Sequence, residues 1–264
     1  MSPFEPPIRN ACYTVFSDES GVGERVLGYG GTLMPGHVVS KIEAHLEAFA
    51  SSVGFGAKEF NWKKCSKNEL DRYKLFVDAF WDLQAPRSRL DFRAMLVDTA
   101  KNPLTAPAAG CHNDEEGFYK LYHFFITRSL ENVGARSTCV DLRVAVVPDR
   151  YPYRAEILGK TVGGRLKDEL GTHALVTEVN RGTPKMARVH QLADVRLGAV
   201  TYRVSKRDPQ GLSQKRFLCE HIEARVGKRL DHDFLPSQRP FNIWFFASGG
   251  SNCWGKGAQG VVGR

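Results

Sequence analysis

Short β-forming segments alternate with longer segments of helical periodicity along most of this chain, and this alternation limits the fold more than any other feature. The clearest strand is predicted at 142–147, where β-branched residues precede Pro148-Asp149. A helix predicted at 155–170 and a strand predicted at 174–179 follow it. A strand–helix–strand succession implies a crossover connection, and therefore a sheet with helices packed on its faces.

The N-terminal part of the chain predicts a hairpin ahead of this succession. Residues 11–17 and 25–33 are short and rich in β-forming residues, and only a turn-like segment beginning at Asp18 separates them. So short a gap favours antiparallel pairing. The other predicted elements are a strand at 91–97 and helices at 38–49, 67–83, 115–130, 189–204 and 213–230. Together these elements predict an α/β fold.

The length of 264 residues suits one large domain. We expect an N-terminal arm at 1–10 and the main domain at 11–205. A C-terminal extension at 206–246 is expected to pack on that domain. Residues 247–264 hold many glycines and no periodicity, so we expect a flexible tail.

The composition narrows the location and the partners of the chain. Six scattered cysteines with no CxxC pair indicate reduced thiols and a cytoplasmic protein. No apolar run approaches the roughly 20 residues that span a bilayer, and the N-terminus lacks the pattern of a signal peptide, so we expect no membrane partner. A net charge of +8 favours anionic partners, of which nucleic acid is the commonest. A protein partner or a homo-oligomer is also compatible with the sequence.

Four carboxylates stand at positions where this kind of sheet carries its chemistry. Asp18 follows the first predicted strand and Asp149 follows the strongest one. Glu59 lies in the segment 56–62, and Asp194 lies early in the last crossover helix. Sheets with crossover connections place their chemistry at strand ends, so residues distant in sequence can meet there.

A divalent cation explains why such carboxylates would converge. Mg²⁺ and Mn²⁺ prefer oxygen ligands, and a pair of such ions can activate water and stabilise the leaving oxygen in phosphodiester hydrolysis. Converging acids without a cation would repel one another. Each residue also has a structural interpretation: Asp18 and Glu19 suit a turn, and Asp149 suits a helix N-cap. Asp194 is the most informative, because its helix face is otherwise apolar and a buried acid needs a partner.

Two short motifs resemble a known family. Phe16-Ser-Asp-Glu-Ser-Gly21 and Gln191-Leu-Ala-Asp194 look like the DE pair and the QxxD motif of the family catalogued as domain of unknown function 3800. Glu59-Phe-Asn-Trp62 is similar to its E-x-K-W element, and Val144-Ala-Val-Val-Pro-Asp149 is similar to its fourth strand. The resemblance covers about 12–204.

The resemblance implies an RNase H-like mixed sheet with helices on both faces, followed by the C-terminal helical extension. It also implies that the metal-binding and catalytic carboxylates are Asp18, Glu59, Asp149 and Asp194, holding Mg²⁺ or Mn²⁺. The residues assigned to substrate binding are Glu19, Gln191, Trp62 and Lys63. Gln191 is expected one helical turn before Asp194 on the same face. Trp62 is a candidate for stacking on a base, with a place in the core as the alternative.

Three functions are consistent with these residues. The first is a metal-dependent nuclease, a hydrolase that acts on RNA, DNA or a hybrid. The second is a catalytically weak nucleic-acid-binding or partner-docking module of the same fold. This second function is favoured by Asn61, which stands where the family often has Lys, and by the absence of an Asp-Ser pair before Gly182-Thr-Pro184. The third is phosphoryl chemistry on a small nucleotide.

Overall fold

The computed structural model describes residues 13–83, 90–104, 113–132, 139–146, 168, 173–181, 187–205, 213–235 and 239–246. Within 139–146 and 173–181 it describes the backbone. The helix expected at 155–170 lies outside the described residues apart from Asp168, and Asp149 lies outside them as well.

The described strands form one sheet in the order β5-β4-β1-β2-β3-β6. The strands are β1 (Tyr13–Ser20), β2 (Val26–Pro35), β3 (Asp91–Asp98), β4 (Cys139–Val146), β5 (His173–Arg181) and β6 (Phe241–Phe246). The first three strands pair antiparallel in sequence order, as the short predicted hairpin requires. By contrast, β4 runs parallel to β1 and to β5, and β6 runs parallel to β3. The predicted mixed α/β sheet is therefore confirmed.

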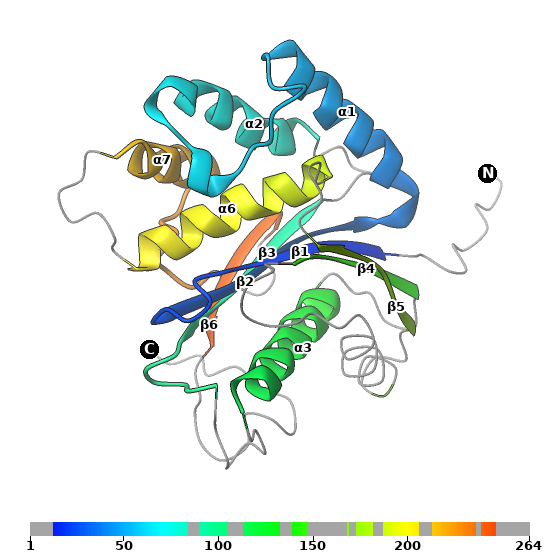
Figure 1. Cartoon of the computed structure of the whole chain (residues 1–264), viewed down its shortest axis with the longest axis vertical. Helices are drawn as coiled ribbons and strands as arrows, with labels where there is room; N and C mark the ends of the chain where they lie inside the picture. The colour runs from blue at the N-terminus through cyan, green and yellow to red at the C-terminus, as the bar shows by residue number, and fades with distance from the viewer. Residues whose placement is uncertain are drawn as a thin grey trace, which may run out of the picture.

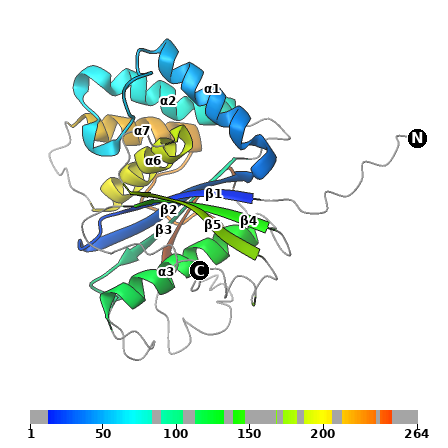
Figure 2. The same cartoon turned by 45° about the vertical axis from the view of Figure 1, so that its right-hand side comes forward.

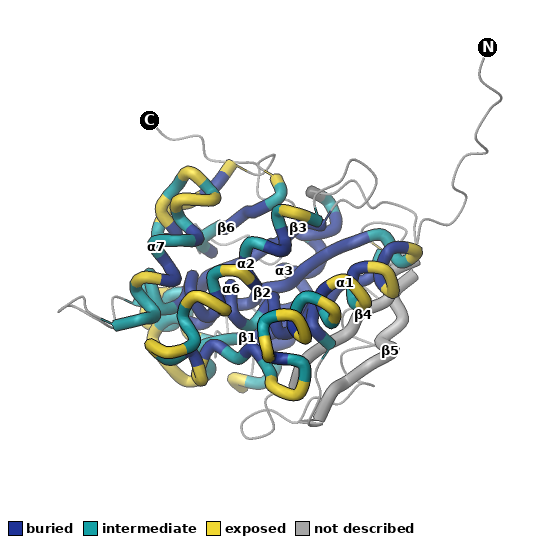
Figure 3. Tube along the Cα trace, turned by 90° about the horizontal axis from the view of Figure 1, so that it is seen from above, coloured by how far each residue is buried: buried dark blue, intermediate teal, exposed yellow. Residues whose placement is uncertain are grey.

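Helices cover both faces of this sheet (Figure 1). On one face lie α1 (Val39–Ser52), α2 (Leu70–Asp82), α6 (Arg188–Ser205) and α7 (Gln214–Val226), and on the other lies α3 (Asp114–Asn132). The turned view in Figure 2 shows that α6 lies between the sheet and the outer helices. Consistent with this place, most of α6 is buried, whereas α1, α2 and α7 expose their outer sides (Figure 3).

The two faces of β1 reach separate hydrophobic clusters, because successive side chains of a strand point to opposite sides. Val15 packs in the cluster that holds the aromatic face of α3. Phe16 packs in the cluster shared with α6. Helix α6 approaches the sheet closely: a Cβ added at Gly30 would lie 2.8 Å from Cδ1 of Leu197. Glycine in β2 therefore makes room for the helix that carries Asp194.

Among the boundaries that differ from the sequence-based expectation, two have clear reasons. Strand β1 continues to Ser20, because its residues pair with β2 as far as Ser20 opposite Gly28, so Asp18 and Glu19 lie within the strand. Helix α7 ends at Val226, where Gly227 takes a left-handed conformation with φ of 72°. A glycine of this kind is a common helix stop, and it shortens the helix expected at 213–230.

The C-terminal part of the described chain joins the same sheet. Strand β6 pairs with β3 at the edge, and α7 packs against α6 and α2. No helix among the described ranges is long and apolar enough to span a membrane.

Candidate metal centre

The carboxyl groups of Asp18 and Asp194 meet between β1 and α6. Asp18 points to the α6 side of the sheet, as Phe16 does two residues earlier. The ring of Phe16 contacts His190, one helical turn before Asp194, with 5.0 Å between the ring centroids. The two carboxyl groups are in hydrogen-bond contact, which requires a shared proton when no cation lies between them.

Both carboxyl groups have raised pKa values. Burial is the largest cause for Asp18, and the charges of Asp194 and Glu19 raise its pKa further. Burial also raises the pKa of Asp194, to about 6, although the Trp62 N–H and the charge of Lys63 oppose this rise. The environment therefore disfavours ionisation of both groups together, and a cation in place of the shared proton would relieve the repulsion.

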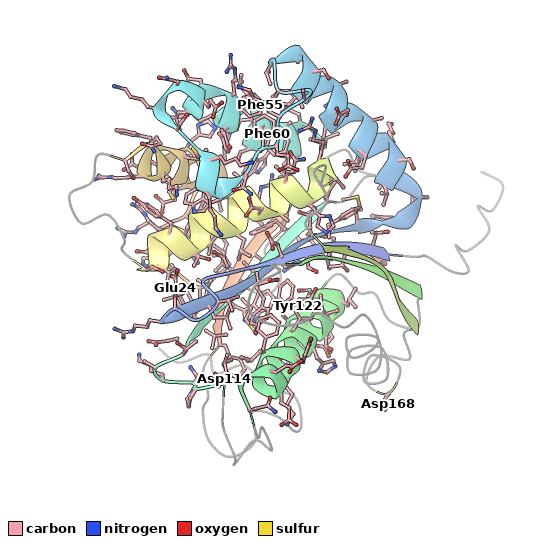
Figure 4. The ribbon with its side chains drawn as sticks, in the orientation of Figure 1. Glu24, Phe55, Phe60, Asp114, Tyr122 and Asp168 are labelled. Atoms are coloured by element: carbon pink, nitrogen blue, oxygen red, sulfur yellow. The ribbon has the colours of Figure 1, made fainter. Side chains whose placement is uncertain are left out.

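The segment 55–62 lies over α6 and is held by it through backbone groups. Asp194 Oδ2 accepts a hydrogen bond from the Trp62 N–H at 2.8 Å. Gln191 Oε1 accepts one from the Phe60 N–H at 2.9 Å. The expectation that Gln191 and Asp194 share one helix face is therefore confirmed, and both contact the same segment. Figure 4 shows Phe60 and Phe55 in the helical layer above α6.

Arg188 binds the same segment one turn earlier on α6, and the sequence did not single it out. Its guanidinium donates to the carbonyl oxygens of Lys58 at 2.7 Å, Gly56 at 2.9 Å and Phe55 at 3.2 Å. Its charge is balanced by Glu47 of α1, 2.7 Å away. The sequence contained one usable signal: positions 188, 191 and 194 repeat every three residues and so share a helix face.

Glu59 and Lys63 border the carboxyl pair from this segment. Glu59 is one quarter exposed and lies 3.9 Å from the Lys64 ammonium. Its charge raises the pKa of Asp194, whereas the charge of Lys63 lowers it, so both side chains are within electrostatic reach of Asp194. Lys63 is exposed to solvent. The structure thus brings three of the four predicted carboxylates, Asp18, Glu59 and Asp194, to one region.

Glu19 follows Asp18 in β1, and its side chain therefore starts on the α3 side of the sheet. Its charge influences Tyr122 of α3, whose hydroxyl forms a buried hydrogen bond with Ser17. Tyr122 points from α3 toward the sheet (Figure 4). The backbone N–H of Glu19 donates to Asp18 Oδ1 at 2.8 Å and so helps to orient that carboxyl group.

Trp62 has the core position that was the alternative to base stacking. Its side chain is 8% exposed. A Cβ added at Gly198 would lie 2.1 Å from Cγ of Trp62, so the indole rests directly on the α6 backbone. Tyr202 packs edge-on against the indole, and the Lys215 ammonium lies 5.2 Å from the ring centroid. These contacts cover the ring.

Two positions depart from the family pattern, and the structure shows what the first does and where the second lies. Asn61 Oδ1 accepts the Lys63 N–H at 2.9 Å and caps the short 3-10 helix η2 (Trp62–Lys64). Capping by a short polar side chain explains Asn here, since a lysine could not accept this bond. The segment 178–181 belongs to β5, so it continues the sheet up to Arg181.

The donor set suits a hard divalent cation, because the facing groups of Asp18 and Asp194 are carboxylates and these supply oxygen ligands. Within the described part of the chain, no group of three or more His, Cys, Asp or Glu residues is placed to hold a metal ion. Asp149, the fourth predicted ligand, follows β4, which pairs in parallel with β1, with Ser17 opposite Val144. The described residues therefore provide a carboxyl pair.

Comparisons with known proteins add a distant likeness. No family model matches the chain. No curated protein matches it either. Among solved structures, a chain in the structure of the PCNA:RNase HII complex from Archaeoglobus fulgidus is similar, with 12% identity, a TM-score of 0.43 and 74% of each chain covered.

Proposed function

We propose that this chain is a metal-dependent nuclease that hydrolyses phosphodiester bonds in nucleic acid, with Asp18 and Asp194 at its centre. Glu59 completes the site from the segment 55–62, and Asp149 is the proposed fourth carboxylate. The cation is Mg²⁺ or Mn²⁺. We also propose, from the motifs at 16–21 and 191–194, that the chain belongs to the family catalogued as domain of unknown function 3800.

The contact between the Asp18 and Asp194 carboxyl groups carries this proposal. Two buried acids that touch lower the stability of a fold, because burial and mutual repulsion both disfavour their ionised forms. A purely structural position would be served as well by an amide. Strongly perturbed acids that touch are typical of functional sites.

Each residue of the centre has a definite task. The Trp62 N–H holds Asp194 Oδ2, and the Glu19 N–H holds Asp18 Oδ1, so both carboxyl groups have a fixed orientation. Lys63 supplies positive charge beside them for an anionic substrate. A bound divalent cation would lower the pKa of water and neutralise charge on the phosphate.

The surface charge around the centre suits a polyanion. Lys58 and Lys64 have side chains 61% and 68% exposed, and Lys63 is exposed as well. The whole chain carries a net charge of +8. Exposed lysines that neutralise phosphates give binding that weakens as salt rises.

The test is cleavage of labelled single-stranded, duplex and hybrid substrates with Mn²⁺ or Mg²⁺. Wild type is compared with Asp18→Asn and Asp194→Asn, which keep the shape of the side chain and remove its charge. Asp71→Asn is the matched control. The side chain of Asp71, on α2, is 94% exposed, and Asp71 has no proposed role in the centre. We expect both centre variants to lose at least about 100-fold in rate, a typical cost of removing a group that stabilises the transition state.

The outcomes separate the nuclease from its alternative. Cleavage by wild type and Asp71→Asn alone supports the proposal, and the preferred substrate then defines the nuclease. If Asp18→Asn and Asp194→Asn cleave as fast as wild type, the activity belongs to another site or to a contaminant.

The second candidate function is a nucleic-acid-binding or partner-docking module that has kept the fold. The specific observation in its favour is Asn61, whose side chain is engaged in capping η2 where the family often has Lys. This candidate predicts salt-dependent binding of nucleic acid with no cleavage under any metal, and with equal affinity in Asp194→Asn.

A further inference from the structure

The side chains of Arg188, Gln191 and Asp194 form a regular series of contacts along the segment 55–62. Arg188 binds backbone carbonyls of residues 55, 56 and 58, Gln191 binds the N–H of residue 60, and Asp194 binds the N–H of residue 62. One face of α6 thus binds backbone groups at five positions of a segment that turns at Gly56 and Ala57.

From this series we infer that Arg188 and Gln191 are positioning residues: they hold the segment 55–62 on α6 so that the Trp62 N–H reaches Asp194 and Glu59 lies beside the carboxyl pair. The inference rests on the proposed function where it concerns the metal. Its structural part, the positioning of the segment, stands independently. In this inference Gln191 is a positioning residue, in place of the substrate-binding role expected from the sequence.

Burial supports positioning for Gln191. Its side chain is 1% exposed, so an approaching polymer cannot reach it without displacing the segment. Its Oε1 accepts two hydrogen bonds at once, from the Phe60 N–H at 2.9 Å and from Arg188 Nη1 at 3.0 Å. A carbonyl oxygen has two lone pairs, so these donors use its accepting capacity in full.

Arg188 is anchored well enough to act as the fixed point of the series. Glu47 Oε2 accepts from its Nε at 2.7 Å, and the guanidinium is 2% exposed. Glu43 accepts from the backbone N–H groups of Arg188 and Val189, both at 2.9 Å, and so satisfies the N-terminus of α6. Helix α1 therefore holds the start of α6 through two glutamates one helical turn apart.

The expected effects follow from what each substitution removes. Gln191→Met keeps the volume and removes the acceptor, which leaves the Phe60 N–H buried and unbonded. Gln191→Glu keeps an acceptor oxygen for both donors. Arg188→Lys keeps the positive charge beside Glu47, but one ammonium cannot reproduce the planar contacts with the segment.

The experiment measures two properties of the full chain: hydrogen exchange of backbone amides in 55–62, and affinity for Mn²⁺ alone by calorimetry. In Gln191→Met and Arg188→Lys we expect exchange at least about tenfold faster and Mn²⁺ affinity about tenfold lower, because one buried hydrogen bond is worth about that factor. Gln191→Glu keeps the acceptor oxygen, so it should match wild type in exchange.

Asn242→Ala is the matched control, since Asn242 is 1% exposed and its amide binds the Leu235 carbonyl at the β6 edge. It should lower the melting temperature without changing exchange in 55–62.

Unchanged exchange in Gln191→Met and Arg188→Lys would overturn the inference. Equal losses in Gln191→Glu and Gln191→Met would overturn it in favour of a direct contact by the amide. If Gln191→Met does not fold, Arg188→Lys and Gln191→Glu decide alone. Wild type that binds no Mn²⁺ would refute the proposed function, whereas the exchange result would still decide the positioning.

Discussion

Asp18 and Asp194 place two carboxyl groups in contact inside the fold, and a chain selected for stability alone would avoid this arrangement. Burial is the largest cause of the raised pKa of both groups, and the charge of Asp194 raises the pKa of Asp18 further. The pair therefore has a consequence for stability that can be measured without any knowledge of the substrate.

We predict that the metal-free protein loses stability as pH rises from about 4 through 6. An acid with a folded pKa above its unfolded value adds no penalty below the unfolded value of 3.8, and the penalty grows as pH rises through the folded value, about 6 for Asp194. Asp18→Asn removes one charge, so it should raise the free energy of unfolding by about 1–3 kcal/mol at pH 8 and by less at pH 4. Urea denaturation in EDTA at both pH values tests this. A gain that is equal at both pH values, or a loss at pH 8, would contradict it, and Asp71→Asn should show neither.

Arg196 is another residue whose burial lowers the stability of the fold, and it has no role in the proposed metal centre. It is fully buried, its guanidinium carbon lies 3.4 Å from the ring centroid of Phe80, and its one described hydrogen bond reaches the Val77 carbonyl at 3.3 Å. Burial lowers its pKa, and among the described residues no carboxylate pairs with it.

We therefore predict that Arg196→Met raises the free energy of unfolding by about 1–2 kcal/mol, because an uncompensated buried charge is replaced by an apolar chain of similar length. Denaturation curves measure it. Arg203→Met is the contrasting variant, since Arg203 pairs with Glu223 at 2.7 Å, and it should lose stability. A loss of stability in Arg196→Met would show that its ring contacts outweigh the cost of burial.

At the scale of elements, the contact between α6 and η2 depends on the absence of a side chain at Gly198. Alanine normally favours a helix by about 1 kcal/mol over glycine, so propensity alone predicts that Gly198→Ala is stabilising. A Cβ there would lie 2.1 Å from Cγ of Trp62, which forces the indole and its segment to move. We predict a net loss of about 1–3 kcal/mol by thermal or urea denaturation. A gain in stability would show that Trp62 moves freely and that the segment is loosely held.

Local patterns predicted many of these elements, and tertiary contacts explain the differences. The period of apolar residues placed α6 at 189–204, close to the observed Arg188–Ser205, because its burial against the sheet follows from that period. Strand β1 was predicted too short, since Asp18 and Glu19 resemble a turn until the partner strand β2 is known. No local signal predicted the pairing of β6 with β3, which joins residues far apart in the chain.

At the scale of the whole molecule, the packing of α6 on the sheet brings together two motifs that lie far apart in the sequence. The QxxD motif and the apolar surroundings of Asp194 predicted its importance, and the DE motif predicted that of Asp18. The contact between the two residues depends on the close packing of α6 on β1 and β2. The Arg188 contacts could not be predicted because they require the path of the segment 55–62. Asp149 lies outside the described residues, so its place in the site stays a prediction.

The central claim is that Asp18 and Asp194 form a divalent-cation site, and calorimetric titration with Mn²⁺ tests it most directly. Wild type, Asp18→Asn, Asp194→Asn and Asp71→Asn are titrated at pH 7.5, above the Asp194 pKa of about 6. We predict saturable binding with proton release by wild type and Asp71→Asn, and affinity lower by at least about tenfold in the other two variants. Equal Mn²⁺ binding by all four proteins, or binding by none, would contradict the account.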